Sequence, residues 1–355
     1  MCSVWFIEQS IRVARARWLR AQAGVMALPV VMIAGVLAWL NQPTIADQWR
    51  RWVTERPFLS ANVWPYILKP EDERALYPGK AFRECAPRQK DSDYCPDMVV
   101  VPAGPFRMGS SSDPAAYPSE FPQHPVTIAQ AFAVSKFEVT FDEWDTCADH
   151  GGCSSGISDR EYGRGSVPVI NVNWDDAHQY VNWLSKITGK TYRLLTEAEY
   201  EYATRAGTTT AYPWGKEIGS KHANCKECGS KWDNHSPAPV GTFTSNGFVG
   251  SFAPNAFGLY DMVGNVWEWV QDCWHPNYEG APSDGRAWTE GDCKRHVNRG
   301  GSFEDVPRDI RSANRYFPRD VDRDTILGFR VARTLSAGAS AITLAPGVRS
   351  APSPQ

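Results

Sequence analysis

The sequence has no surplus of basic residues. Lys and Arg number 37 against 40 Asp and Glu, which gives a formal net charge of −3. No excess positive charge is left for a phosphate backbone, so we do not expect nucleic acid as a partner. The sequence also lacks a Walker loop, a dinucleotide-binding fingerprint and any H-E-x-x-H pairing among its seven His. A hydrophobic fraction of 42% and a charged fraction of 22% are typical of a globular protein.

Long hydrophobic runs are also lacking, with one exception. Residues 21–40 carry no charge, and a helix of that length spans about 30 Å, one hydrocarbon core. Four arginines precede this run, against the single acid Glu8, a flank that favours a cytoplasmic N-terminus. These arginines are Arg12, Arg15, Arg17 and Arg20. We therefore expect a single-pass inner-membrane anchor with a periplasmic body; a cleaved signal peptide is the alternative.

The cysteines favour the same compartment. Apart from Cys2, which is either lipidated or a free thiol, eight cysteines form four neighbouring pairs along the chain. The pairs are Cys85 with Cys95, Cys147 with Cys153, Cys225 with Cys228, and Cys273 with Cys293. This spacing predicts four local disulfides in an oxidising compartment, although eight cysteines allow many connectivities. A zinc or redox site at Cys225-x-x-Cys228, with His222 and His235 nearby, is the alternative.

The chain divides into five stretches. They are a cytoplasmic lead (1–20), the anchor (21–40), a connector (41–95), a body (96–333) and a flexible, Pro-bearing tail (334–355).

The body reads as a mixture of short strands and a few helices. Asn173 is a helix N-cap with Gly189 as the stop, and Thr196 with Glu199 forms a capping box before a helix that Gly207 ends. Short apolar runs such as MVVVP, FAVSKFEVT and LGFRVAR lie around them, separated by Gly, Pro and Asn. The pattern predicts an α+β domain rich in ordered loops.

The order of the body's fragments is specific. From Met98 onward the sequence contains MVVVPAGPFRMGS, VPVINVNWDDAHQYVNWLS, YRLLTEAEYEYATRAG, YPWG, NAFGLYDMVGNVWEWVQD, NRGGSF and LGFRVAR. This series resembles the formylglycine-generating enzyme, or sulfatase-modifying factor, family over about 235 residues. The resemblance implies a single loop-rich domain related to the C-type-lectin fold.

The resemblance departs from the family at its reactive centre. Active members carry a cysteine pair after the Gly-Gly-Ser segment, and thiolates are the ligands suited to Cu(I). Here Gly300-Gly301-Ser302 is followed by FEDVPRDIR, which has no cysteine. Asp305 stands where the first cysteine is expected, and Asp309 lies near the second. We therefore do not expect copper, and the remaining catalytic candidates are Asp305, Asp309 and Arg311.

The resemblance also implies a calcium site, because the sequence matches the family's calcium-binding segment. The segment LYDMVGNVWEW implies a structural ion held by Asp261, Glu268 and the carbonyls of Gly264 and Val266, which agrees with the oxygen donors that Ca²⁺ prefers. Turn capping and solvated charge are the alternative roles for the two acids. A second site implied by the family maps more loosely onto Asn224, Asp233 and the carbonyls of Cys225 and His235.

Four arginines are further candidates for a functional pocket. We expect some of them, together with Asp305 and Asp309, to line a polar pocket around the Gly300-Gly301 turn, and the others to form internal ion pairs. They are Arg299, Arg311, Arg315 and Arg330.

Two functions are compatible with these residues. In the first, the body is a periplasmic binding or accessory module for a protein, peptide or small ligand. In the second, it is an enzyme of the same family that performs another oxidation or maturation step on a secreted substrate. An enzyme would need Asp305 or Asp309 individually, whereas a binding module would tolerate Ala at either position.

Overall fold

The computed structural model describes residues 55–86, 95–111, 113–232, 235–240, 242–244, 247–249 and 252–336. The chain divides into two compact units, Met1–Pro57 and Phe58–Gln355, and the second unit carries the fold. Within the described ranges, no helix is long and apolar enough to cross a membrane. The predicted anchor at 21–40 and most of the predicted tail lie outside those ranges.

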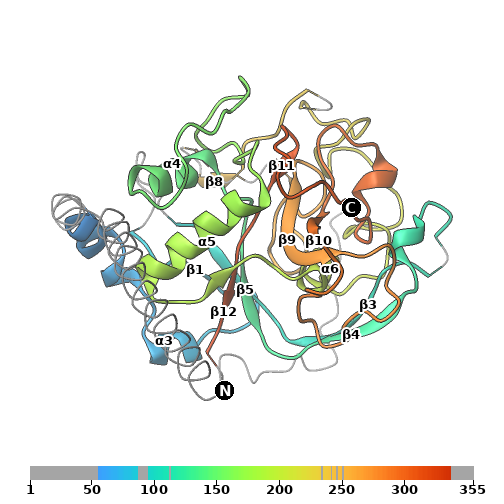
Figure 1. Ribbon diagram of the computed structural model, residues 1–355, viewed down its shortest axis with the longest axis horizontal. Coiled ribbons are helices and arrows are strands. Elements are labelled where there is room, and N and C mark those ends of the chain that lie inside the picture. Colours follow the sequence, from blue (N-terminus) through green and yellow to red (C-terminus); the bar gives the residue numbers. More distant parts are fainter. Residues whose placement is uncertain are drawn as a thin grey trace, which may run out of the picture. The chain divides into compact units, whose positions relative to one another are not determined.

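A five-stranded antiparallel sheet forms the centre of the second unit (Figure 1). Its strands, in spatial order, are β1 (Ala81–Phe82), β2 (Met98–Val101), β5 (Phe132–Ser135), β12 (Ala332–Thr334) and β6 (Tyr192–Arg193). The predicted strand MVVV is therefore confirmed as β2. Residues far apart in sequence meet here, since Val99 pairs with Val134 and Val134 with Ala332.

Both faces of this sheet are covered. Met98 and Val100 belong to one buried cluster, whereas Val99 and Val101 belong to another. Every side chain of β2 is buried, as expected for a strand that packs on both faces. A strand of this kind has no polar face to alternate with, which explains its continuous run of apolar residues.

Helices and a smaller sheet form the two covering layers. The helices α4 (Phe141–Asp149) and α5 (Trp174–Thr188) contribute to the first cluster and lie on one side of the sheet in Figure 1. The helix α6 (Glu197–Arg205) contributes to the second cluster. The smaller sheet has the order β10 (Asp292–Arg299), β9 (Trp267–Trp274) and β11 (Leu327–Gly328).

The remaining elements are short. They are the strand pairs β3 (Gly104–Met108) with β4 (His124–Ile128) and β7 (Thr242–Thr244) with β8 (Gly247–Val249), the helix α3 (Pro70–Arg74), a helical stretch at 55–62, and the 3₁₀ turns η1 (Trp64–Tyr66), η2 (Pro118–Glu120) and η3 (Pro307–Ile310).

Both predicted helix starts are confirmed. The side chain of Asn173 accepts a hydrogen bond from the N–H of Asp176, and Thr196 accepts one from the N–H of Glu199. Gly189 ends α5 with a left-handed backbone. The helix α4 begins with a third capping box, Thr140 with Glu143, at the end of the apolar run FAVSKFEVT, where the sequence analysis predicts no helix.

The four predicted disulfides are confirmed. Sulfur pairs join Cys85 to Cys95, Cys147 to Cys153, Cys225 to Cys228, and Cys273 to Cys293. The alternative of a zinc site at Cys225 and Cys228 is not supported, because both sulfurs are bonded to each other. Part of the predicted connector also packs on the sheet, where Val63 and Leu76 join the first buried cluster.

Candidate functional site

The turn after β10 holds the segment in which the family resemblance implies a reactive cysteine pair. Gly301 has φ +84°, and a Cβ there would collide with Ile310, so glycine is required at this position. Asp305 folds back on the turn, and its carboxylate accepts hydrogen bonds from the N–H of Ser302 (2.9 Å) and from the Ser302 hydroxyl. Burial raises the pKa of Asp305, an effect that the Ser302 bonds oppose. The side chain acts as a cap of its own loop.

The other two catalytic candidates face a different segment. Asp309 accepts a hydrogen bond from the Tyr117 hydroxyl at 2.6 Å, and this bond raises the pKa of Tyr117. Arg311 donates two hydrogen bonds, of 2.8 and 2.5 Å, to the carboxylate of Glu120. The structure therefore joins Asp309 and Arg311 to the segment around η2, whereas Asp305 bonds to its own turn.

The four candidate arginines all form buried ion pairs. The pairs are Arg299 with Glu201, Arg311 with Glu120, Arg315 with Glu197, and Arg330 with Glu268. The expectation that some of them line a pocket around the glycine turn is corrected for Arg299, Arg315 and Arg330, whose side chains are fully buried. Arg311 does line a cavity, but this cavity encloses only about 70 Å³.

The predicted calcium segment lies beside one of these pairs. Asp261 is buried, and neither of its carboxylate oxygens has a hydrogen-bond partner in the described part of the chain. Burial raises the pKa of Asp261 to about 7, with Arg330 opposing and the charge of Glu268 adding to the shift. A buried carboxylate without a partner is costly unless it is protonated or meets a cation. Asp261 therefore fits a calcium ligand.

Glu268 fits the ion less simply. Its two carboxylate oxygens already accept hydrogen bonds of 2.7 and 2.8 Å from Arg330. Glu138 lies nearby; one of its oxygens accepts a hydrogen bond from Asn265, and the other has no hydrogen bond but forms an ion pair with Arg330 at 3.7 Å. Burial, and then the charge of Asp261, raise the pKa of Glu138. Among the described residues, no group of three or more Asp, Glu, His or Cys is arranged to hold a metal, so calcium here would depend on backbone carbonyls.

The residues of the looser second site are engaged in other contacts. Asn224 is fully buried, donates to the Ser236 carbonyl at 2.9 Å and accepts from the Ser230 hydroxyl at 2.9 Å. The Cys225 carbonyl, one of the implied ligands, accepts a hydrogen bond from the N–H of Cys228 at 3.3 Å. For His235 the bonded atom is the N–H, which donates to the Trp232 carbonyl, and not the carbonyl that the site would use. Asp233 lies outside the described residues. The two implied calcium segments meet, because the N–H of Asn265 donates to the Asn224 carbonyl at 2.8 Å.

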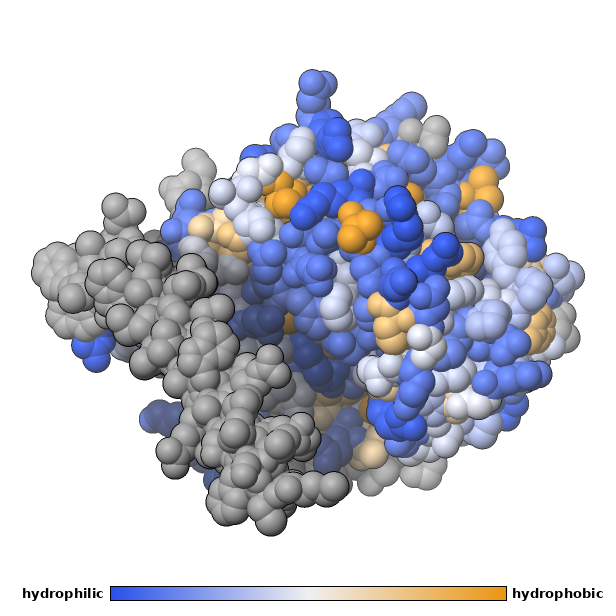
Figure 2. All heavy atoms as spheres, viewed as in Figure 1, coloured by the Kyte–Doolittle hydropathy of each residue, from blue (hydrophilic) through white to orange (hydrophobic). Residues whose placement is uncertain are grey.

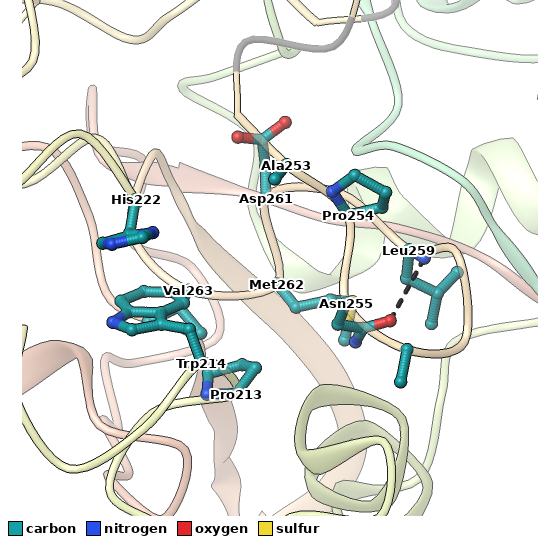
Figure 3. Close-up of a pocket in the computed structure, with 11 residues that line it drawn as sticks. Pro213, Trp214, His222, Ala253, Pro254, Asn255, Leu259, Asp261, Met262 and Val263 are labelled. Carbon is teal, nitrogen blue, oxygen red and sulfur yellow. Dashed lines mark hydrogen bonds between the residues drawn. The ribbon is translucent and has the colours of Figure 1, made fainter. Parts of the chain in front are cut away.

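A larger pocket lies beside the calcium segment (Figure 3). It encloses about 160 Å³. Trp214 and His222 form one wall with stacked rings 5.1 Å apart, while Leu259, Met262 and Pro254 contribute apolar surface. Figure 3 shows the Asp261 carboxylate pointing away from Trp214, so the acid lines the pocket without aiming at this ring. The sequence reading did not assign this pocket, although YPWG and LYDMVG supply its walls.

The described residues present few apolar features on the face drawn in Figure 2. Figure 2 shows a face that is mostly hydrophilic, with apolar residues in small separate patches. Among the described residues, the exposed large apolar side chains include the neighbours Tyr316 and Phe317.

Comparisons with known proteins agree with this architecture. A formylglycine-generating enzyme of Thermomonospora curvata is 30% identical over 274 residues, covering 61% of this chain and 86% of that protein. An inactive C-alpha-formylglycine-generating enzyme 2 of Bos taurus is 36% identical over 142 residues, covering 38% of this chain and 40% of that protein. The solved structure of PvdO from Pseudomonas aeruginosa is 41% identical with a TM-score of 0.63, covering 73% of this chain and 99% of that one. Residues 82–335 match the sulfatase-modifying factor enzyme 1-like domain, and the chain therefore belongs to this family.

Proposed function

We propose that the chain is a membrane-anchored periplasmic binding or accessory module that does not perform the copper-dependent oxidation of a cysteine. The observation that carries the proposal is the state of the cysteines. All eight in the described part of the chain are paired in disulfides. That part therefore offers no thiolate pair for Cu(I), and carboxylates do not replace soft ligands. The relatives include a protein named inactive, so the fold also serves chains without the activity.

The ligand we propose is a protein or peptide segment. The pocket beside Trp214, at about 160 Å³, is smaller than the roughly 300 Å³ at which sites for whole small molecules begin. Its size suits one side chain of a bound segment. The Trp214 and His222 rings supply the rigid contact area that such an anchor needs.

We propose that calcium, where it binds, is structural. Asp261 would hold the ion with the carbonyls of Gly264 and Val266, while Glu268 would share its carboxylate between the ion and Arg330. The unpartnered oxygens of Asp261 support this assignment. The ion would supply positive charge to a buried group of three acids that has only one arginine beside it.

A peptide oxidation assay tests the first proposal. The full chain is incubated with a cysteine-containing peptide, Cu(I) and oxygen, and peptide aldehyde is measured by mass spectrometry, with the Thermomonospora curvata relative as positive control. We expect no aldehyde from this chain. Aldehyde formation would overturn the proposal.

Peptide selection tests the binding role. Peptides selected from a phage-displayed library on the full chain should bind Trp214→Ala at least ten-fold more weakly. Trp64→Ala removes a tryptophan that is 44% exposed elsewhere and is the matched control. Equal binding by both variants would contradict a peptide site in this pocket.

A further inference from the structure

One of the four described disulfides differs from the rest in its exposure. Cys273 in β9 is 2% exposed, whereas its partner Cys293 in β10 is exposed to solvent. In the other three disulfides both cysteines are buried, none more than 9% exposed. The Cys273–Cys293 bond therefore joins a buried residue to one that is exposed to solvent.

A histidine contacts the buried sulfur. His296 lies directly across from Cys273 in the antiparallel β9–β10 pair, and its Nε2 is 3.9 Å from the Cys273 Sγ. Its Nδ1 is 2.8 Å from a carboxylate oxygen of Asp320, which also accepts from the backbone N–H of His296. This contact holds a proton on Nδ1 and turns Nε2 toward the sulfur.

Packing fixes the orientation of this ring. The His296 imidazole stacks on Trp174 with ring centroids 3.9 Å apart and an angle of 11°. The Trp174 indole N–H in turn donates to the Val270 carbonyl at 3.0 Å. The His178 ring also contacts Trp174, with ring centroids 3.9 Å apart. The His296 imidazole thus contacts the Asp320 carboxylate through one nitrogen and the Cys273 sulfur through the other. These groups lie at one end of the β9–β10 pair, which is visible in Figure 1.

We propose that Cys273–Cys293 is a thiol–disulfide exchange site for an external dithiol, with His296 as the acid for the leaving sulfur. A thiolate of the dithiol attacks the Cys293 Sγ, the S–S bond breaks, and Cys273 leaves as a thiolate that takes the Nε2 proton of His296 in its imidazolium form. His296 keeps its Nδ1 proton on Asp320 and regains the Nε2 proton from solvent. The second thiol of the reagent then attacks its own sulfur in the mixed disulfide and releases Cys293. Two electrons pass from the dithiol, which becomes a disulfide, to the protein cysteines, which become two thiols.

We expect this disulfide to exchange faster than the other three because of its leaving sulfur, the Cys273 Sγ. Exchange is faster when the leaving sulfur is a stabilised thiolate, and an adjacent imidazolium supplies that stabilisation. Asp320 is a positioning residue in this scheme, because it touches only the imidazole. The proposal stands apart from the binding role above and needs none of the residues of the Trp214 pocket.

The test follows reduction of the folded full chain by dithiothreitol. Free thiols are blocked with N-ethylmaleimide at timed intervals, and each cysteine is quantified in peptides by mass spectrometry. We expect Cys273–Cys293 to open at least ten-fold faster than the other three pairs. His296→Gln should slow this opening at least ten-fold, while His124→Gln, which removes a histidine packed on Tyr278, should leave it within two-fold. A His296→Gln rate within two-fold of wild type would overturn the proposal.

A second measurement needs only the wild-type chain. Brief exposure to glutathione, a monothiol, should trap a mixed disulfide on Cys293 and leave Cys273 as the blocked thiol. An adduct on Cys273, or a different disulfide opening first, would overturn the proposal even if His296→Gln fails to fold.

Discussion

The carboxylate of Asp305 accepts hydrogen bonds from the N–H and the hydroxyl of Ser302, three residues earlier. The position at which the family resemblance implies a reactive cysteine is thus occupied by a carboxylate that bonds to its own turn. A carboxylate used in this way stabilises the loop, and its Oδ2 already accepts two hydrogen bonds from Ser302.

Replacing Asp305 should therefore affect stability more than binding. We expect Asp305→Ala to lower the free energy of unfolding by about 1–3 kcal/mol, because the Ser302 donors lose their acceptor inside a buried turn. Glu304→Ala, one residue away, should change it by less than about 0.5 kcal/mol. Urea unfolding measures both, and library-selected peptides measure binding. Wild-type stability together with lost function would indicate a catalytic Asp305 instead.

Arg330 should be among the most sensitive positions of the fold. It is fully buried and pairs with Glu268 at 2.7 Å, with Glu138 3.7 Å away. Arg330→Met leaves buried carboxylates without compensation, so we expect a loss of about 3–5 kcal/mol in urea unfolding. The control is Arg319→Met, which breaks an exposed pair with Asp322 and should cost at most about 1 kcal/mol. Similar losses for the two variants would contradict this account of the buried pair.

Stability should depend on the charge of Asp272. Burial, and then the charge of Glu197, raise the pKa of Asp272 from 3.8 to about 8. A raised pKa means that the folded state holds the proton more tightly than the unfolded state, so this contribution to stability is complete below about pH 4 and is lost as the pH rises through 8. The stability of Asp272→Asn relative to wild type should therefore improve between pH 5 and 9. Urea unfolding across that range checks it, and a difference that is constant with pH would contradict the assignment.

Calcium should stabilise the fold through Asp261. At a calcium concentration 100 times the Kd we expect about 2.7 kcal/mol of added stability, measured as a rise in Tm. Asp261→Asn should abolish most of this rise. Asp284→Asn, which changes an acid that is 62% exposed, should retain it. No rise in the wild-type chain would leave protonation as the explanation of the unpartnered carboxylate.

The sequence predicted the features that depend on local spacing. The capping residues Asn173 and Thr196 mark true helix starts, and neighbouring cysteines do pair. The helix that begins after Thr140 was missed because the apolar run before it continues into the cap. The order of the sequence fragments predicted the family, and the match of residues 82–335 to the family confirms this prediction.

The sequence did not predict contacts between distant segments. Nothing near Arg330 indicates that Glu268 binds it, and nothing near Asp309 indicates a bond to Tyr117, 192 residues away. His296 and Asp320 are likewise 24 residues apart, so the group around Cys273 forms only when the chain folds. Long-range pairing of this kind is set by tertiary packing, which a local pattern does not encode.

The copper content of the purified full chain, measured by mass spectrometry with the disulfides intact, tests the central claim most directly. The account predicts no stoichiometric copper after incubation with Cu(I) and removal of unbound metal, because the described cysteines are all paired. One copper per chain would contradict it and would require a thiolate or other soft ligand that the paired cysteines do not supply.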